Sequence, residues 1–100
     1  MLFHVTHTHT AAMCPGAQPE LTPVYTKWWH ELNDTAGVRV LSAYVSPMDH
    51  VFYITVEADE YPVLARALGP LNAIGEGHTS PVITLDQAFP MADESAFRPR

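Results

Sequence analysis

The chain opens with the stretch LFHVTHTHT, residues 2–10, in which apolar Phe3 and Val5 alternate with polar His4 and Thr6. β-branched residues are frequent in this stretch. This pattern predicts a β-strand. Side chains two residues apart on a strand point in the same direction, so Phe3, Val5, His7 and His9 share one face. Because Phe3 and Val5 are apolar, we expect this face to meet the core and the two histidines to lie at one end of it.

Five further elements are predicted from capping residues, apolar spacing and turn residues. They are a helix with Thr22 as its N-cap that runs to about Asn33, strands over residues 38–46 and 51–58, a helix opening at Asp59 or Glu60, and a strand over residues 78–85. Pro70 is expected to kink or shorten the second helix, because proline lacks an amide hydrogen. The order strand–helix–strand–strand–helix–strand predicts an α+β fold of the ferredoxin-like βαββαβ type. This fold has a four-stranded antiparallel sheet with two helices on one face.

Length and composition favour one globular domain. The chain has 100 residues, of which 47% are hydrophobic, and this fraction is too high for general disorder. We expect residues 1–86 to form a single ferredoxin-like domain. Residues 87–100 have a weak pattern and are expected to form a C-terminal tail that wraps a neighbouring subunit or stays mobile.

Charge and segment composition exclude several classes of protein. The formal net charge is −6, with 5 Lys and Arg residues against 11 Asp and Glu residues, which argues against a nucleic acid or an anionic membrane surface as partner. The sequence has no apolar run of the roughly 20 residues that cross a bilayer. Its first residues lack the basic and apolar regions of a secretory signal, so we expect a cytoplasmic protein.

The element order and size resemble those of the dimeric α/β-barrel superfamily. This group includes antibiotic-biosynthesis-type monooxygenases, muconolactone-isomerase-like proteins and small stand-alone domains. The resemblance covers about residues 1–86 and implies a homodimer in which two sheets pack face to face. No catalytic motif of a named member is matched, so the resemblance implies fold and dimerisation more than activity.

Most of the metal-ligating residue types are predicted at one end of the sheet. That end collects the last part of the first strand, the loop after it, the turn between the second and third strands, and the start of the last strand. These segments carry five of the seven His and Cys residues, namely His7, His9, Cys14, His50 and His78.

The core ligand set is expected to be His7, His9 and His50, because these histidines share the parity of the apolar residues on their strands. Cys14 or His78 is expected as the fourth ligand. Imidazole together with thiolate favours Zn or Cu, with Ni also compatible, over Mg or Ca. The His-x-His motif alone is weak, and hydrogen-bonded polar residues at a strand end are the structural alternative.

The opposite face of the sheet is predicted to be polar and to carry His4, Tyr44 and Tyr53. Inside a face-to-face dimer, as the resemblance implies, these side chains would bind a small aromatic or oxygenated ligand or donate protons. This gives a competing hypothesis of a monooxygenase- or isomerase-like enzyme. A ligand-binding dimer without catalysis is a third hypothesis, and a solvated face or a plain interface is the structural alternative. The sequence contains neither a glycine-rich phosphate loop nor a serine nucleophile motif, so no organic cofactor is predicted.

Overall fold

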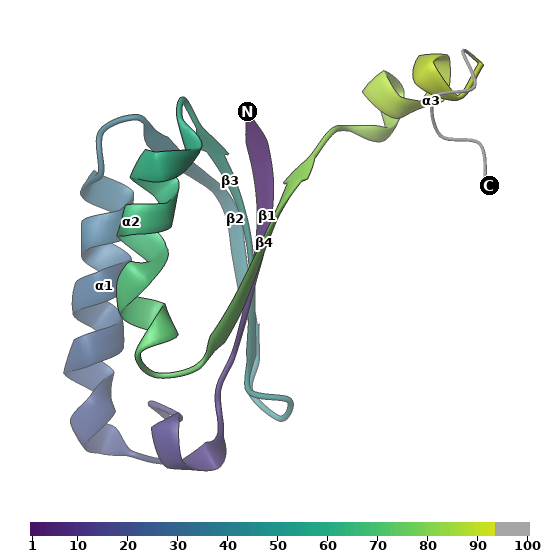
Figure 1. Ribbon diagram of the computed structural model, residues 1–100. Helices are drawn as coiled ribbons and strands as arrows, with labels where there is room; N and C mark the ends of the chain where they lie inside the picture. Colours follow the sequence, from purple (N-terminus) through teal and green to yellow (C-terminus); the bar gives the residue numbers. More distant parts are fainter. Residues whose placement is uncertain (94–100) are drawn as a thin grey trace.

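The computed structural model describes residues 1–93 (Figure 1). Its elements follow one another as β1 (Leu2–Thr8), the 3-10 helices η1 (Ala11–Met13) and η2 (Pro19–Leu21), α1 (Thr22–Asp34), β2 (Val38–Ser46), β3 (Val51–Ala58), α2 (Tyr61–Asn72), β4 (Glu76–Val82) and α3 (Leu85–Asp93). The α+β class and the four-stranded antiparallel sheet are confirmed. Within the described residues, each helix is too short or too polar to cross a membrane.

The strands of the sheet are ordered β2-β3-β1-β4, and every neighbouring pair is antiparallel. The two inner strands are therefore β1 and β3. Their register places Val5 opposite Ile54 and His7 opposite Phe52. Because directly opposed residues share a face of the sheet, these four side chains all point to the same side.

Helices α1 and α2 lie side by side over that one face of the sheet (Figure 1). The core between the two layers contains Phe3, Val5 and His7 from β1, which are at most 2% exposed. Their burial confirms the predicted phase of the first strand. The helices contribute buried residues at helical spacing, including Trp28 and Leu32 from α1.

Two details of the helices differ from the prediction or refine it. Thr22 was predicted as an N-cap, but α1 begins at Thr22 directly after η2, and the Thr22 hydroxyl donates to the carbonyl of Pro15 instead. Helix α2 ends at Asn72, two residues beyond Pro70. The amides of Ala73 and Ile74 then bond to carbonyls three residues back, which tightens the last turn as expected after a proline.

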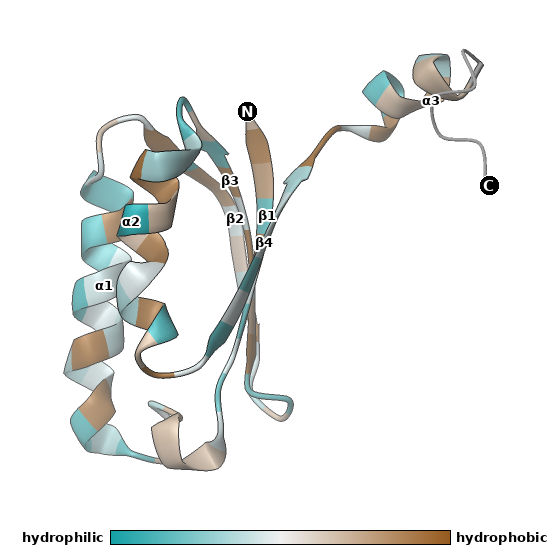
Figure 2. Ribbon diagram, viewed as in Figure 1, coloured by the Kyte–Doolittle hydropathy of each residue, from teal (hydrophilic) through white to brown (hydrophobic). Residues whose placement is uncertain are grey.

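The predicted start of the C-terminal tail is helical. Strand β4 ends at Val82, earlier than predicted, and α3 begins at Leu85. Thr84 and Gln87 form a reciprocal capping box, in which the Gln87 amide donates to the Thr84 hydroxyl and the Thr84 amide donates to the Gln87 side chain. Figure 1 shows α3 standing away from both layers, and Figure 2 shows hydrophobic residues between β4 and α3. Residues 94–100 of the predicted tail lie outside the described residues.

Candidate metal centre

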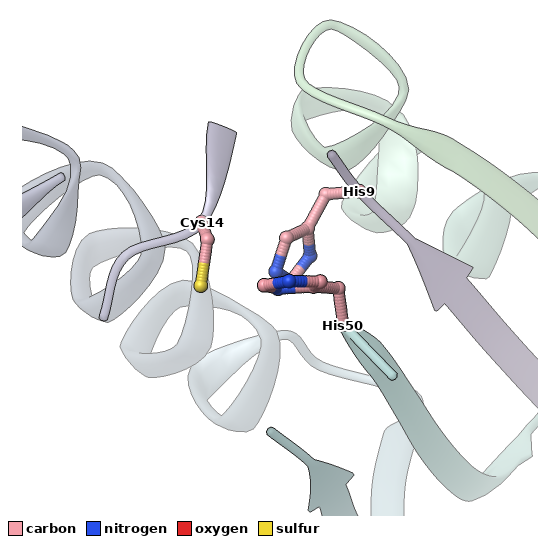
Figure 3. A group of neighbouring side chains, drawn as sticks. All are labelled: His9, Cys14 and His50. Carbon is pink, nitrogen blue, oxygen red and sulfur yellow. The ribbon is translucent and has the colours of Figure 1, made fainter. Parts of the chain in front are cut away.

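Three of the predicted ligands come together at one end of the sheet. His9 follows the last residue of β1, Cys14 follows η1, and His50 precedes β3. One ligand atom from each lies within 4.8 Å of the other two, and Figure 3 shows the three side chains directed toward one another. Around a tetrahedral metal, nitrogen and sulfur ligands are about 3.3–3.6 Å apart. Side-chain rotations that bring these atoms together by about 1 Å would complete the site.

The backbone places His50 in an uncommon conformation. Its φ of 57° lies in the left-handed region, which costs a non-glycine residue about 1 kcal/mol. The turn is held by the Ser46 hydroxyl, which donates to the Asp49 carboxylate at 2.9 Å. The amide of His9 also donates to the carbonyl of His50 at 3.1 Å, so the two histidines are linked through the main chain. Local strain that the surroundings maintain is common at functional sites.

The loop that carries Cys14 is attached to α1 on both sides of the thiol. The Tyr25 hydroxyl donates to the carbonyl of Met13 at 2.7 Å, and the Thr22 hydroxyl donates to the carbonyl of Pro15 at 3.2 Å. Cys14 is half-buried and faces the two imidazoles (Figure 3). No spacing motif in the sequence connects Tyr25 to Cys14, so this contact was not predicted.

The imidazoles of the group have ring nitrogens that lack partners. Nδ1 of His9 and Nδ1 of His50 are buried, and neither has a hydrogen bond among the described residues. A buried nitrogen without a partner costs about 1–3 kcal/mol. Burial, and then the nearby charge of His50, lowers the pKa of His9, so its ring is neutral at neutral pH. Neutral imidazole is the form that binds a metal, and the donor set therefore fits one.

His7 lies deeper in the protein than this group. Its ring is fully buried, its centroid is 5.3 Å from that of His9, and neither of its nitrogens has a partner within residues 1–93. Burial, and then the charge of His9, lowers the pKa of His7 to about 4. Gly75 lies against this ring, since a Cβ at position 75 would be 2.5 Å from Cε1 of His7. His7 is still inside the strand ladder, whereas His9 lies beyond its end, so His7 is not part of the three-residue group.

The structure does not bring His78 to the group. His78 lies opposite Thr6, and Thr6 points away from the helices because its neighbours Val5 and His7 point toward them. The face that His78 shares with Thr6 also carries the three residues proposed for a dimer lumen. His4 lies opposite Thr55, and Tyr44 lies opposite Tyr53. Tyr44 is 73% exposed and Tyr53 is 40% exposed.

Comparison with known proteins supports the fold alone. No family model and no curated protein matches the chain. Among solved structures, the chain is similar to SCO4226 from Streptomyces coelicolor A3(2), with a TM-score of 0.51 and 16% sequence identity over 84% of this chain and 100% of that chain. The two share a compact α+β fold with a four-stranded antiparallel sheet.

Proposed function

We propose that this protein binds one transition-metal ion per chain through His9, Cys14 and His50. The observation that carries the proposal is the convergence of their three ligand atoms within 4.8 Å. The buried Nδ1 atoms without partners and the left-handed backbone of His50 support it. Hydrogen-bonded polar residues at a strand end, the structural alternative, account less well for nitrogens that form no hydrogen bonds.

The donor set indicates the class of metal. Two imidazoles and one thiolate favour Zn or Cu, and Ni is also compatible with them. A structural zinc site normally has four protein ligands, whereas a site with three leaves one coordination position for water or a substrate. A metal held by these three residues alone would keep one coordination position for such a molecule. A thiol ligand must remain reduced, which supports a cytoplasmic location.

Metal content per chain tests this function. Untagged protein is purified without chelator, reconstituted with Zn, Cu or Ni, desalted and analysed for metal. We expect close to one equivalent in the wild type and in His30→Ala and His78→Ala, whose histidines are exposed and outside the group. Cys14→Ala and His50→Ala should lose it. Absence of bound metal after reconstitution, or equal metal in all five proteins, would reject the site.

We further propose that residues 1–86 form a ferredoxin-like domain that dimerises through its open face, as in dimeric α/β barrels. Leu41, Tyr44 and Tyr53 on this face are 40–73% exposed. Leu85 and Phe89 of α3 are also exposed, at 71% and 63%. Isolated helices as short as α3 are marginal in water, so its apolar side chains favour a role in covering a second copy.

A further inference from the structure

A cleft of about 360 Å³ lies between α1 and the edge strand β2. Ala43 and Val45 of β2 lie opposite Ile54 and Phe52, so they are on the helix side of the sheet. Both are nevertheless exposed, and Val45 is 53% exposed. The helices therefore leave the part of β2 that carries Ala43 and Val45 uncovered. The cleft therefore lies on the helix side of this edge, and Tyr44, which belongs to the proposed dimer face, also lines it there.

The walls of the cleft are aromatic and held in place. Trp28 is buried, and its indole nitrogen donates to the carbonyl of Ala67 at 3.1 Å. Its ring is stacked with that of Phe52, with the ring centroids 6.4 Å apart and an angle of 13° between the ring planes. Trp29 lines the same cleft. None of the described lining residues carries a charge. The hydroxyl of Thr26, which also lines it, donates to main-chain carbonyls of its own helix. Such a preformed, uncharged cleft favours an aromatic ligand.

The cleft and the candidate metal centre share a wall. Tyr25 and Phe52 line the cleft, and their ring centroids lie 5.7 and 5.4 Å from that of His9. Pro15, which directly follows Cys14, also lines the cleft. A molecule in the cleft therefore lies against the same side chains that surround the metal ligands.

We propose that this cleft binds a small, uncharged aromatic molecule and presents it to the metal. Its volume exceeds the roughly 150 Å³ of a protein cavity that binds benzene, which leaves room for one or two rings. Presentation to the metal rests on the proposed metal-binding function, whereas aromatic binding rests on the cleft alone. The chain's two tryptophans both line the cleft, so binding is observable by their fluorescence.

The test compares two probes on zinc-loaded protein. Benzohydroxamic acid carries a ring and a metal-binding group, and acetohydroxamic acid carries the same group without the ring. We expect the aromatic probe to bind at least about tenfold more tightly, because its ring leaves water. Ala43→Phe should fill the cleft and remove this preference, while zinc content stays unchanged. His30→Phe is the matched control, since His30 is exposed on α1 and does not line the cleft.

The outcomes separate the two proposals. Equal binding of both probes to zinc-loaded protein would overturn the inference and leave the metal site intact. If zinc does not bind, the metal function fails, and the cleft is tested in metal-free protein with benzyl alcohol. A saturable fluorescence change that Ala43→Phe removes supports aromatic binding, and no change overturns it. A change of molecular mass in Ala43→Phe, but not in His30→Phe, would identify the cleft as a subunit interface instead and overturn the inference.

Discussion

Gly75 is predicted to be the position at which a single added methyl group most directly disturbs the metal centre. A Cβ there would lie 2.5 Å from Cε1 of His7 and even closer to the carbonyl oxygen of Thr8. Unbonded carbon atoms pack at about 3.5–4.0 Å, so Gly75→Ala creates an overlap of about 1 Å with the His7 ring. The carbonyl of Thr8 belongs to the backbone and cannot rotate away. Both neighbours lie directly before His9, so the strain falls on a metal ligand.

The expected cost of Gly75→Ala is about 3 kcal/mol in the free energy of unfolding, at the upper end for overpacking because backbone must move. For a domain of this size, this lowers the melting temperature by roughly 12–24 °C. Chemical denaturation and thermal melts followed by circular dichroism measure both quantities. Zinc titration of the folded fraction should also show weaker binding, since the end of β1 shifts.

Gly69→Ala is the matched control for this substitution. A Cβ at Gly69, inside α2, would meet nothing within 4 Å. The helix preference of alanine is opposed there by the steric clash of its Cβ with the ring of Pro70, so Gly69→Ala should change the free energy of unfolding by less than about 1 kcal/mol and leave metal binding unchanged. In a His7→Ala background, the cost of Gly75→Ala should fall but stay above about 1 kcal/mol, because the Thr8 contact remains. If the free energy of unfolding of Gly75→Ala lies within about 0.5 kcal/mol of the wild-type value, the close packing of Gly75 against His7 is refuted.

Three further predictions concern acid, metal and assembly. The pKa of His7 is about 4 in the folded protein and 6.5 in the reference state. Metal-free protein should therefore be most stable above pH 6.5, and its free energy of unfolding should fall by up to about 3 kcal/mol as the pH falls to 4. An equally steep loss in His7→Leu would contradict this. Metal at about 100 times its dissociation constant should add about 2.7 kcal/mol to the free energy of unfolding, and chelator should reverse this in wild type but have no effect on Cys14→Ala. Phe89→Asp should convert the proposed dimer to monomer by light scattering, whereas Met48→Asp, in the β2–β3 turn, should not; identical masses for both would exclude a role of α3 in assembly.

The secondary structure was largely readable from local patterns. The alternation in residues 2–10 predicted both the first strand and the face that it buries, because Phe3 and Val5 set the phase for the histidines that follow. Helix α3 was missed although Thr84 and Gln87 carry a capping-box signal, since the segment is short and contains Pro90, a residue that disfavours a helix interior. The facing of His78 was not predictable, because β4 lacks a regular apolar alternation and takes its register from β1.

The sequence by itself determined the α+β class, the buried phase of β1 and a set of five candidate ligands. Only the tertiary structure decided which of them meet. His9 and His50 are brought together by strand pairing and a left-handed turn, and Cys14 joins them because Tyr25 and Thr22 hold its loop to α1. These contacts join residues distant along the chain, and strand register and turn geometry depend on packing across the whole sheet. Local sequence patterns specify which way a side chain points along its own strand, but they carry no information about the distance to a side chain on another element.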